Sequence, residues 1–307
     1  MKKAFTLVEL VFVIVVLGIV GMIGSDIIAK MYQGYLKSQI TNRLQTQTEL
    51  LLDVISQRLK YRIKESVIGR NSSDNRYMKL SDDNISSVSP DMIEWIGYDR
   101  DSLIGESNGS YSTPGWSGFV DVNSSETNRT QVLMPGSDLS IAKSVIDTLS
   151  DGKVVISNLN SRAILYSMCE KDSNMSRFGW DIPAPLNTAI FDNNMTIKVY
   201  KKNNKTHLYF DDIGSREICE QYLLAWSAYA IVPEGDKDND FNLTLKYNYQ
   251  PWNGENYSTD SKSSLLAEHV STFRAMQVGN SIRIKVCIQD GNITGTPYGF
   301  CKEKVIY

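Results

Sequence analysis

Residues 1–28, MKKAFTLVELVFVIVVLGIVGMIGSDII, decide the architecture of this chain. A short basic leader, Lys2-Lys3, is followed by an apolar segment from Leu7 to Ile23 that only Glu9 interrupts. An apolar segment of this length can cross a bilayer as a helix. A carboxylate inside such a helix costs about 3 kcal/mol unless it finds a partner. An ordinary membrane anchor has no use for that carboxylate, so Glu9 indicates a specific role.

An ordinary secretory signal fits these residues less well. Such a signal has a shorter apolar core, which is followed directly by small residues at a cleavage site. No such site follows cleanly here, because the helical pattern continues past Ser25 through Ile27 and Met31. The pattern therefore favours a helix with a dedicated function over a generic signal or anchor.

The run Ala4-Phe5-Thr6-Leu7-Val8-Glu9-Leu10 resembles the class III signal of type IV pilins and type II secretion pseudopilins. In that family the leader is removed just before the Phe, the new amino terminus is N-methylated, and a Glu stands fifth in the mature chain. The resemblance implies cleavage between Ala4 and Phe5 and makes Glu9 the assembly residue. The family usually has Gly before the cut, whereas this chain has Ala4. Because Ala is the smallest alternative, we expect slower or host-adapted processing.

The same resemblance implies a fold, a location and partners. The expected fold is α+β and pilin-like, with a long amino-terminal helix, transmembrane in its first half, packed on an antiparallel β-sheet head. The subunit would cross the bacterial inner membrane once, with a periplasmic head, and then enter a pilus or pseudopilus. Its implied partners are other pilin-like subunits, the prepilin peptidase and methylase, and an inner-membrane assembly platform. In the filament, Glu9 would meet the amino group of Phe5 on the adjacent subunit and set the axial register.

The helical period continues beyond the membrane segment. Apolar residues recur at intervals of three, four or seven from Tyr32 to Ile63, and no proline occurs before Pro90. These features predict one helix from Phe5 to about Val67, roughly 90 Å long at about 1.5 Å per residue. The predicted divisions are a leader at 1–4, a transmembrane or filament-core helix at 5–28, an amphipathic continuation at 29–68 and a β-rich head at 69–307.

The head is predicted to consist of strands with one short helix. Residues 69–137 are rich in Ser, Asp, Asn and Gly, and we interpret them as a long, partly ordered connector with apolar islands at Met92–Tyr98 and Trp116–Val122. The run DLSIAKSVIDTL, residues 138–149, predicts a helix with Ser137 or Asp138 as its N-cap. Strands are predicted at Lys153–Ser157, Ala163–Met168, Met195–Tyr200, His207–Phe210, Tyr222–Val232 and Phe241–Tyr249.

The clearest hairpin lies near the carboxyl end. Ser271–Val278 and Ser281–Gln289 flank Gly279-Asn280, a pair that suits a primed two-residue turn. In the second strand Ile282, Ile284, Val286 and Ile288 alternate with Arg283, Lys285 and Cys287. A final strand is predicted at Lys302–Tyr307. Residues 265–290, LLAEHVSTFRAMQVGNSIRIKVCIQD, also resemble the closing hairpin of the larger minor pseudopilins, the J type of type II secretion and the W type of type IV pili.

The four cysteines fit an exported head. An even number of cysteines in an oxidising compartment suggests two disulfides, and four cysteines allow three pairings. We predict the pairs Cys287–Cys301 and Cys169–Cys219.

Asparagine sequons give a second indication of the compartment. Asn-x-Ser/Thr occurs at eleven positions, and eight of these carry Asp or Glu two residues before the Asn, although acidic residues are 35 of 307 and chance predicts about one. This pattern resembles the acceptor of the bacterial periplasmic oligosaccharyltransferase. Clustering of Asp, Asn and Ser in polar loops is the competing explanation, but it accounts for fewer than eight. The glycosylation candidates are Asn84, Asn108, Asn123, Asn128, Asn174, Asn194, Asn242 and Asn292.

One acidic run is a candidate for a metal ion. Asp236, Asp238 and Asp240 alternate between two predicted strands, and alternate Asp residues can converge on calcium. The EF-hand pattern fails, however, because Phe241 and Tyr247 stand where its Gly and terminal Glu are required. A solvated hairpin loop is the favoured interpretation, so no cofactor is expected and calcium remains the minority alternative.

No enzymatic motif occurs, and the two histidines, His207 and His269, lie far apart in the sequence. The net charge of −3 argues against a general nucleic-acid-binding surface, although Lys198, Lys201, Lys202 and Lys205 form a small basic cluster. The leading interpretation is a structural minor pseudopilin or minor type IV pilin, and not an enzyme. The alternative is a pilus-tip adhesin or DNA-uptake receptor, in which the long head binds a target.

Overall fold

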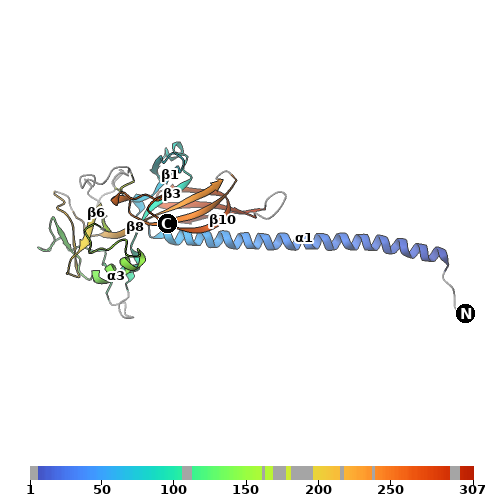
Figure 1. Cartoon of the computed structure of the whole chain (residues 1–307), viewed down its shortest axis with the longest axis horizontal. Coiled ribbons are helices and arrows are strands. Elements are labelled where there is room, and N and C mark those ends of the chain that lie inside the picture. Colours follow the sequence, from blue (N-terminus) through green and yellow to red (C-terminus); the bar gives the residue numbers. More distant parts are fainter. Residues whose placement is uncertain are drawn as a thin grey trace.

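A computed structural model describes residues 6–105, 113–160, 163–168, 178–180, 196–214, 218–236, 239–290 and 298–307. The chain is an α+β protein, in which a long apolar amino-terminal helix is followed by a large antiparallel sheet. The helix projects from one end of an elongated head (Figure 1).

The long helix, α1 (Leu7–Lys60), is attached to the head through its second half alone. Its first buried residue is Leu44, and its first contact with the head is at Lys37, whose ammonium lies 5.2 Å from the ring centroid of Tyr298. Residues 7–36 extend beyond these contacts for about 45 Å at about 1.5 Å per residue. The buried residues recur every three or four positions and form one stripe; they are Leu44, Thr48, Leu51, Leu52, Ile55 and Leu59. The apolar first half and the amphipathic second half of the helix are thus distinct in their contacts.

The helix ends seven residues before the predicted end at Val67, so the predicted helical continuation over 29–68 is too long. Directly after the helix, the buried guanidinium of Arg62 donates to the carbonyl oxygens of Leu59 (2.8 Å) and Asn280 (2.6 Å). The amide of Ile63 then donates to the carbonyl oxygen of Ile96 at 2.8 Å. These long-range bonds turn the chain toward the sheet, and the local sequence pattern does not contain them.

The described strands form one antiparallel sheet with the order β12-β11-β10-β9-β8-β5-β6-β7-β4. A branch leaves this sheet at β8, where β3 pairs with β8, β1 pairs with β3, and β2 pairs with β1. The strands are β1 (Ile68–Arg70), β2 (Tyr77–Lys79), β3 (Met92–Tyr98), β4 (Gln131–Leu133), β5 (Ala163–Ser167), β6 (Thr196–Lys201), β7 (His207–Tyr209), β8 (Tyr222–Asp236), β9 (Asp240–Tyr249), β10 (Lys262–Val278), β11 (Ser281–Gln289) and β12 (Gly299–Ile306). The shorter helices are α2 (Arg100–Ile104) and α3 (Leu139–Leu149), with 3-10 turns η1 (Lys64–Ser66), η2 (Ile85–Ser87) and η5 (Pro251–Asn253).

Three clusters of buried apolar residues hold the head together. The first lies between α1 and the strands β8 to β12, where the predicted alternation places Ile284 and Val286 of β11 against the helix. The second fills the lobe farthest from the free end of α1, around α3 and β4 to β7 (Figure 1). The third covers β3 and β8 on the face that includes Trp180 and Trp252.

The interpretation of residues 69–137 as a connector is wrong. The apolar island Met92–Tyr98 is β3, a buried strand between β1 and β8. The polar residues around it close turns and caps: Asp99, for example, accepts a hydrogen bond from the amide of Ser102 at the start of α2. A buried strand flanked by such turns has the same composition as a loop with an apolar island.

Two other strand predictions also change. Residues 153–157 form turns, in which the amide of Val154 donates to the hydroxyl of Ser150 at 3.0 Å and the apolar side chains fill the core. Strand β10 begins at Lys262, well before the predicted Ser271, because bulges between Leu265 and Val270 break the period of two. The predicted helix at 138–149 is confirmed as α3, with Asp138 as its N-cap.

Candidate functional site at the amino-terminal helix

The first half of α1, residues 7–36, is an apolar surface that the head does not cover, and we call it the free half. Leu7, Phe12 and Met22 are 79%, 72% and 77% exposed, and apolar side chains emerge on all sides of the helix. Among the described residues, α1 is the one helix long and apolar enough to cross a membrane. A soluble protein rarely exposes so large an apolar surface, so this helix fits a single-pass membrane protein.

Glu9 closes the amino-terminal end of this helix. Its Oε2 accepts hydrogen bonds from the amide and the hydroxyl of Thr6, both at 3.0 Å, and the hydroxyl of Thr6 accepts from the amide of Glu9 at 3.4 Å. This reciprocal arrangement is a capping box, which satisfies amides that the helix leaves without partners. The sequence interpretation missed this role, although Thr6-Leu7-Val8-Glu9 has the required Thr-x-x-Glu spacing.

The capping box occupies one side of the carboxylate. Both bonds from Thr6 end on Oε2, and Oε1 of Glu9 has no hydrogen-bond partner among the residues that the structure describes. A carboxylate can accept several hydrogen bonds, so Glu9 can cap its own helix and receive a cation from another molecule. The predicted processing residues Ala4 and Phe5 lie outside the described residues.

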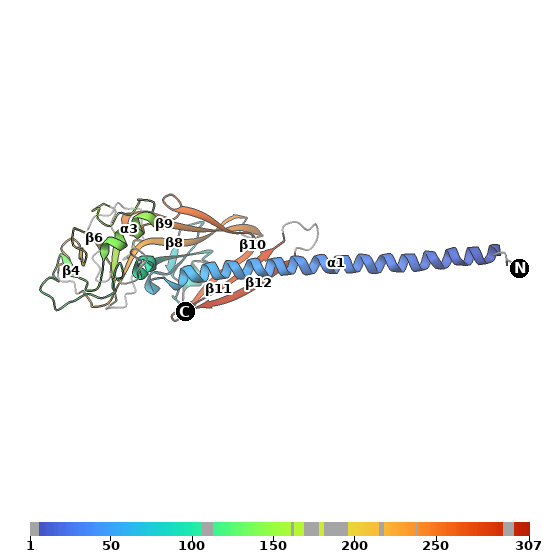
Figure 2. The ribbon, with the colours of Figure 1, turned by 90° about the horizontal axis from the view of Figure 1, so that it is seen from below.

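Ion pairs fix the second half of α1 to the carboxy-terminal strands. The guanidinium of Arg43 lies 2.8 Å from a carboxylate oxygen of Asp290, while Lys302 pairs with Glu49 and Lys304 pairs with Asp53. Figure 2 shows α1 running across β11 and β12, the strands beside which these pairs form. Together with the buried stripe, they attach the second half of the helix to the head.

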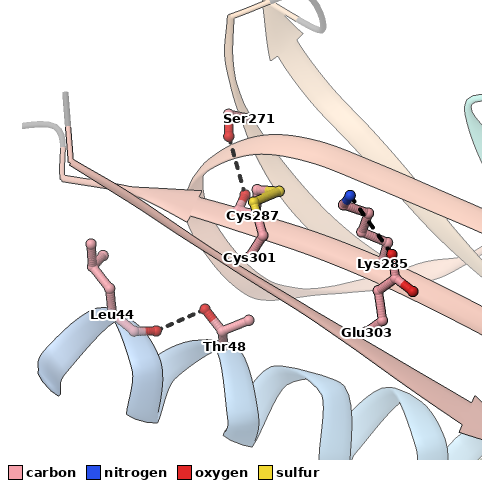
Figure 3. Close-up of a disulfide and its surroundings, with 7 residues drawn as sticks. All are labelled: Leu44, Thr48, Ser271, Lys285, Cys287, Cys301 and Glu303. Atoms are coloured by element: carbon pink, nitrogen blue, oxygen red, sulfur yellow. Dashed lines mark hydrogen bonds and ion pairs between the residues drawn. A yellow bond between two sulfur atoms is a disulfide. The ribbon is translucent and has the colours of Figure 1, made fainter. Parts of the chain in front are cut away.

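A disulfide joins the same two strands on the other face of the sheet. Cys287 and Cys301 are register partners in β11 and β12 and form the expected pair (Figure 3). The adjacent register pair Lys285 and Glu303 has its charged groups 3.7 Å apart. Cys219 is also disulfide-bonded, and Cys169, its predicted partner, lies outside the described residues.

Four of the glycosylation candidates lie in the described part of the chain, and all four are exposed: Asn84, Asn123, Asn128 and Asn242. In two of them the preceding acid closes a turn, because Asp82 accepts from the amide of Asn84 at 2.9 Å and Asp121 accepts from that of Asn123 at 3.1 Å. The acid at this position therefore has a conformational role as well. Asn108, Asn174, Asn194 and Asn292 lie outside the described residues.

The structure describes two of the three aspartates of the acidic hairpin. Asp236 and Asp240 are register partners at the end of β8 and β9, and Asp240 lies 3.0 Å from the ring of His269. Asp238 lies outside the described residues. Within the described ranges, no group of three or more His, Cys, Asp or Glu side chains could hold a metal ion. The other histidine, His207, is buried beside Glu126, with Nε2 and Oε2 2.7 Å apart.

No protein-family model matches this chain, and neither a curated protein nor a solved structure matches it significantly. The fold and the site themselves define a class: an α+β protein with one membrane-type helix at its amino-terminal end, capped by Glu9 and fixed to a β-rich head. Any narrower assignment depends on the chemistry of that helix.

Proposed function

We propose that this chain is a minor pseudopilin or minor type IV pilin. In this role it is cleaved, N-methylated and assembled into a pilus or pseudopilus for protein secretion, piliation or DNA uptake. One observation carries the proposal: a single unbroken helix has an exposed apolar half containing Glu9 and a second half fixed to an antiparallel head. Such a molecule works by assembly and needs no catalytic group.

The apolar half of α1 suits two environments that shield it from water, one before assembly and one after it. Before assembly, the helix remains in the inner membrane, where its side chains contact lipid, and the head lies in the periplasm. After extraction, the same side chains need another apolar environment, because exposure to water is unfavourable. A bundle formed with the helices of neighbouring pilin-like subunits provides that environment.

Glu9 sets the position of the subunit within that bundle. In the proposed filament, Oε1 of Glu9 accepts from the methylated amino group of Phe5 on the next subunit, while Oε2 keeps the capping box with Thr6. A buried carboxylate without a partner is unfavourable by several kcal/mol, so registers that leave Glu9 unpaired are disfavoured. The charge pair therefore selects one axial register.

The mature amino terminus tests this proposal directly. Mass spectrometry of the protein from its native host is expected to find N-methyl-Phe5 as the first residue. An intact leader, or a cut after residue 20, would contradict the proposed function. A matched substitution, Ala4→Gly, restores the usual family residue and is expected to speed cleavage.

A binding role for the head is the second candidate, as a pilus-tip adhesin or DNA-uptake receptor. The observation in its favour is a pair of tyrosine rings on β6 and β7. Strand β6 lies in the lobe farthest from the amino-terminal end of α1 (Figure 1). Tyr200 and Tyr209 face each other across β6 and β7 with ring centroids 6.0 Å apart, and the ammonium of Lys202 lies 4.4 Å from the Tyr209 centroid. Partly exposed rings beside a cation are typical of surfaces that stack on nucleic-acid bases.

Deletion of the gene separates the two candidates. Lost secretion or lost piliation would favour the assembly role. Normal filaments that no longer bind a surface or DNA would favour the receptor role.

A further inference from the structure

A pocket of about 430 Å³ opens where the end of α1 meets β3, α2 and β8. Its lining includes Arg58 and Tyr61 from α1 and its C-cap, Arg100 from α2, and Trp226 and Tyr229 from β8. The middle of this lining lies about 45 Å along the helix from Ile28, at about 1.5 Å per residue. The pocket therefore belongs to the head and is remote from a membrane surface.

Two arginines of the pocket are held by aromatic rings and by no acid. The guanidinium carbon of Arg58 lies 5.8 Å from the ring centroid of Tyr229, and that of Arg100 lies 4.6 Å from the ring centroid of Tyr61. Neither guanidinium forms an ion pair or a hydrogen bond with any described residue. A cation–π contact attracts the guanidinium to the ring and does not use its N–H groups, which can still donate hydrogen bonds.

The acids in the same lining do not cancel these two charges. Asp53 is already paired with Lys304. Asp99 is buried and hydrogen-bonded to Ser102, and burial raises the pKa of its carboxyl to about 7. Asp101 is exposed at the rim, on α2. Of these three acids, Asp101 is the one whose side chain has no partner among the described residues, and the two arginines outnumber it.

An exposed apolar surface continues from this pocket along α1. Val54 lines both the arginine pocket and a groove of about 570 Å³ that also includes Leu50 and Leu265. These three side chains are 40%, 65% and 53% exposed. On α1, Leu50, Val54 and Tyr61 follow one another at helical spacings of four and seven, so they share one face. An inorganic anion would use the two arginines and leave this apolar surface uncovered.

We propose that this surface docks an amphipathic segment of a partner polypeptide, whose apolar residues cover Leu50 and Val54 and whose Asp or Glu enters the pocket between Arg58 and Arg100. The planar guanidinium fork of arginine binds a carboxylate through paired N–H···O bonds, and both guanidinium groups lie beside an aromatic ring at the pocket. The inference goes beyond the filament role, because it concerns a contact of the head and does not require Glu9 or the membrane helix.

Photo-cross-linking in the native host tests the proposal on the full chain. The photoreactive residue p-benzoyl-phenylalanine is placed at Gln57, an exposed residue in the pocket lining, and cross-linked peptides are identified by mass spectrometry. The expected product is a partner peptide that contains Asp or Glu next to apolar residues. Its yield is expected to fall about tenfold or more in Arg58→Gln/Arg100→Gln, because both forks are lost.

Two comparisons make the result decisive. Arg76→Gln, which removes an exposed arginine paired with Asp74, is expected to leave the yield unchanged. Arg58→Lys/Arg100→Lys keeps both charges but loses the forks, so an intermediate yield is expected. The proposal would be overturned by an undiminished yield in the double Gln variant, by an acceptor peptide without an acidic residue, or by cross-links to lipid alone. The mature amino terminus reports separately on the filament role.

Discussion

Arg62 donates a hydrogen bond of 2.6 Å to the carbonyl oxygen of Asn280, and this bond ties the end of α1 to the turn of the closing hairpin. The same guanidinium donates to the carbonyl oxygen of Leu59 at 2.8 Å. Arg62 is 3% exposed, so it ends the helix and joins two distant parts of the chain from within the core.

Replacing Arg62 is expected to destabilise the head. Arg62→Met retains much of the side-chain volume but removes the side-chain donor to the carbonyl oxygen of Asn280 and one of the donors to that of Leu59, which should lower the free energy of unfolding by about 3 kcal/mol. Thermal unfolding of the full chain in detergent measures the change. The control is Arg283→Met, at an exposed position of β11, which is expected to change it by less than about 0.5 kcal/mol. Equal effects of the two substitutions would contradict the proposed role of Arg62.

Substitutions of Glu9 can separate its capping role from its charge. Glu9→Gln retains an acceptor for Thr6 and removes the charge, whereas Glu9→Val removes both. Membrane insertion and cleavage at Ala4-Phe5 are expected to persist in both variants. If the proposed filament role holds, co-purification with other pilin-like subunits should fall about tenfold or more in both, because the amino group of Phe5 would lose its proposed charged partner. Loss of association in Glu9→Val alone would instead assign the effect to the capping box.

The disulfide between Cys287 and Cys301 is expected to stabilise the head without determining its fold. Its two cysteines are 14 residues apart in the sequence, and opening such a loop should lower the free energy of unfolding by about 3 kcal/mol. The paired substitution Cys287→Ser/Cys301→Ser, followed by thermal unfolding, measures this change. Non-reducing peptide mapping is the companion test, and a peptide linking Cys169 to Cys301 would reject the pairing.

The stability of the head should depend on pH through Asp99. Burial raises the pKa of Asp99 from its usual value of 3.8 to about 7. Between these values the folded state holds a proton that the unfolded state has lost, so the contribution of Asp99 is favourable at low pH and disappears as the pH rises to 7. Asp99→Asn keeps an N-cap acceptor and does not titrate. The variant should therefore gain a few kcal/mol relative to the wild type between pH 4 and pH 7, as measured by urea unfolding. A difference that does not vary with pH would refute this assignment.

Asp82 has two possible roles beside Asn84, as the acid of a glycosylation acceptor and as a hydrogen-bond acceptor in the local turn, and substitutions can separate them. Asp82→Asn keeps a side-chain acceptor for the amide of Asn84 but removes the acid, whereas Asp82→Glu keeps the acid. Mass spectrometry of peptides from the native host should find a glycan on Asn84 in the wild type and in Asp82→Glu, and none in Asp82→Asn. Unmodified Asn84 in all three proteins would contradict the acceptor pattern at this position.

Local patterns predicted the parts of the fold that depend on neighbours in the sequence. The apolar run with its continuing helical period predicted α1, Asp138 before an apolar period predicted α3, and the Gly279-Asn280 turn predicted the β10–β11 hairpin. In each case the contacts that form the element lie within one element or across one tight turn.

The parts that were missed depend on distant contacts. The end of α1 is set by Asn280 and Ile96, and the central position of β3 is set by β8. Likewise, Arg58 and Arg100 are far apart in the sequence, and only the folded chain brings them to one pocket. Glu9 is a different case, because its capping box is local and the Thr-x-x-Glu spacing is visible in the sequence.

The two connections to β12 have a mechanical consequence. In the proposed filament role, tension on the free half of α1 would reach the head through the buried stripe and the pairs Lys302–Glu49 and Lys304–Asp53, and so would enter the last strand of the sheet. Among the described strands, β12 pairs with β11 alone, and an edge strand under load is expected to separate from the sheet first. The disulfide between Cys287 and Cys301 links this strand covalently to β11, so it shares the load with the hydrogen bonds between the two strands.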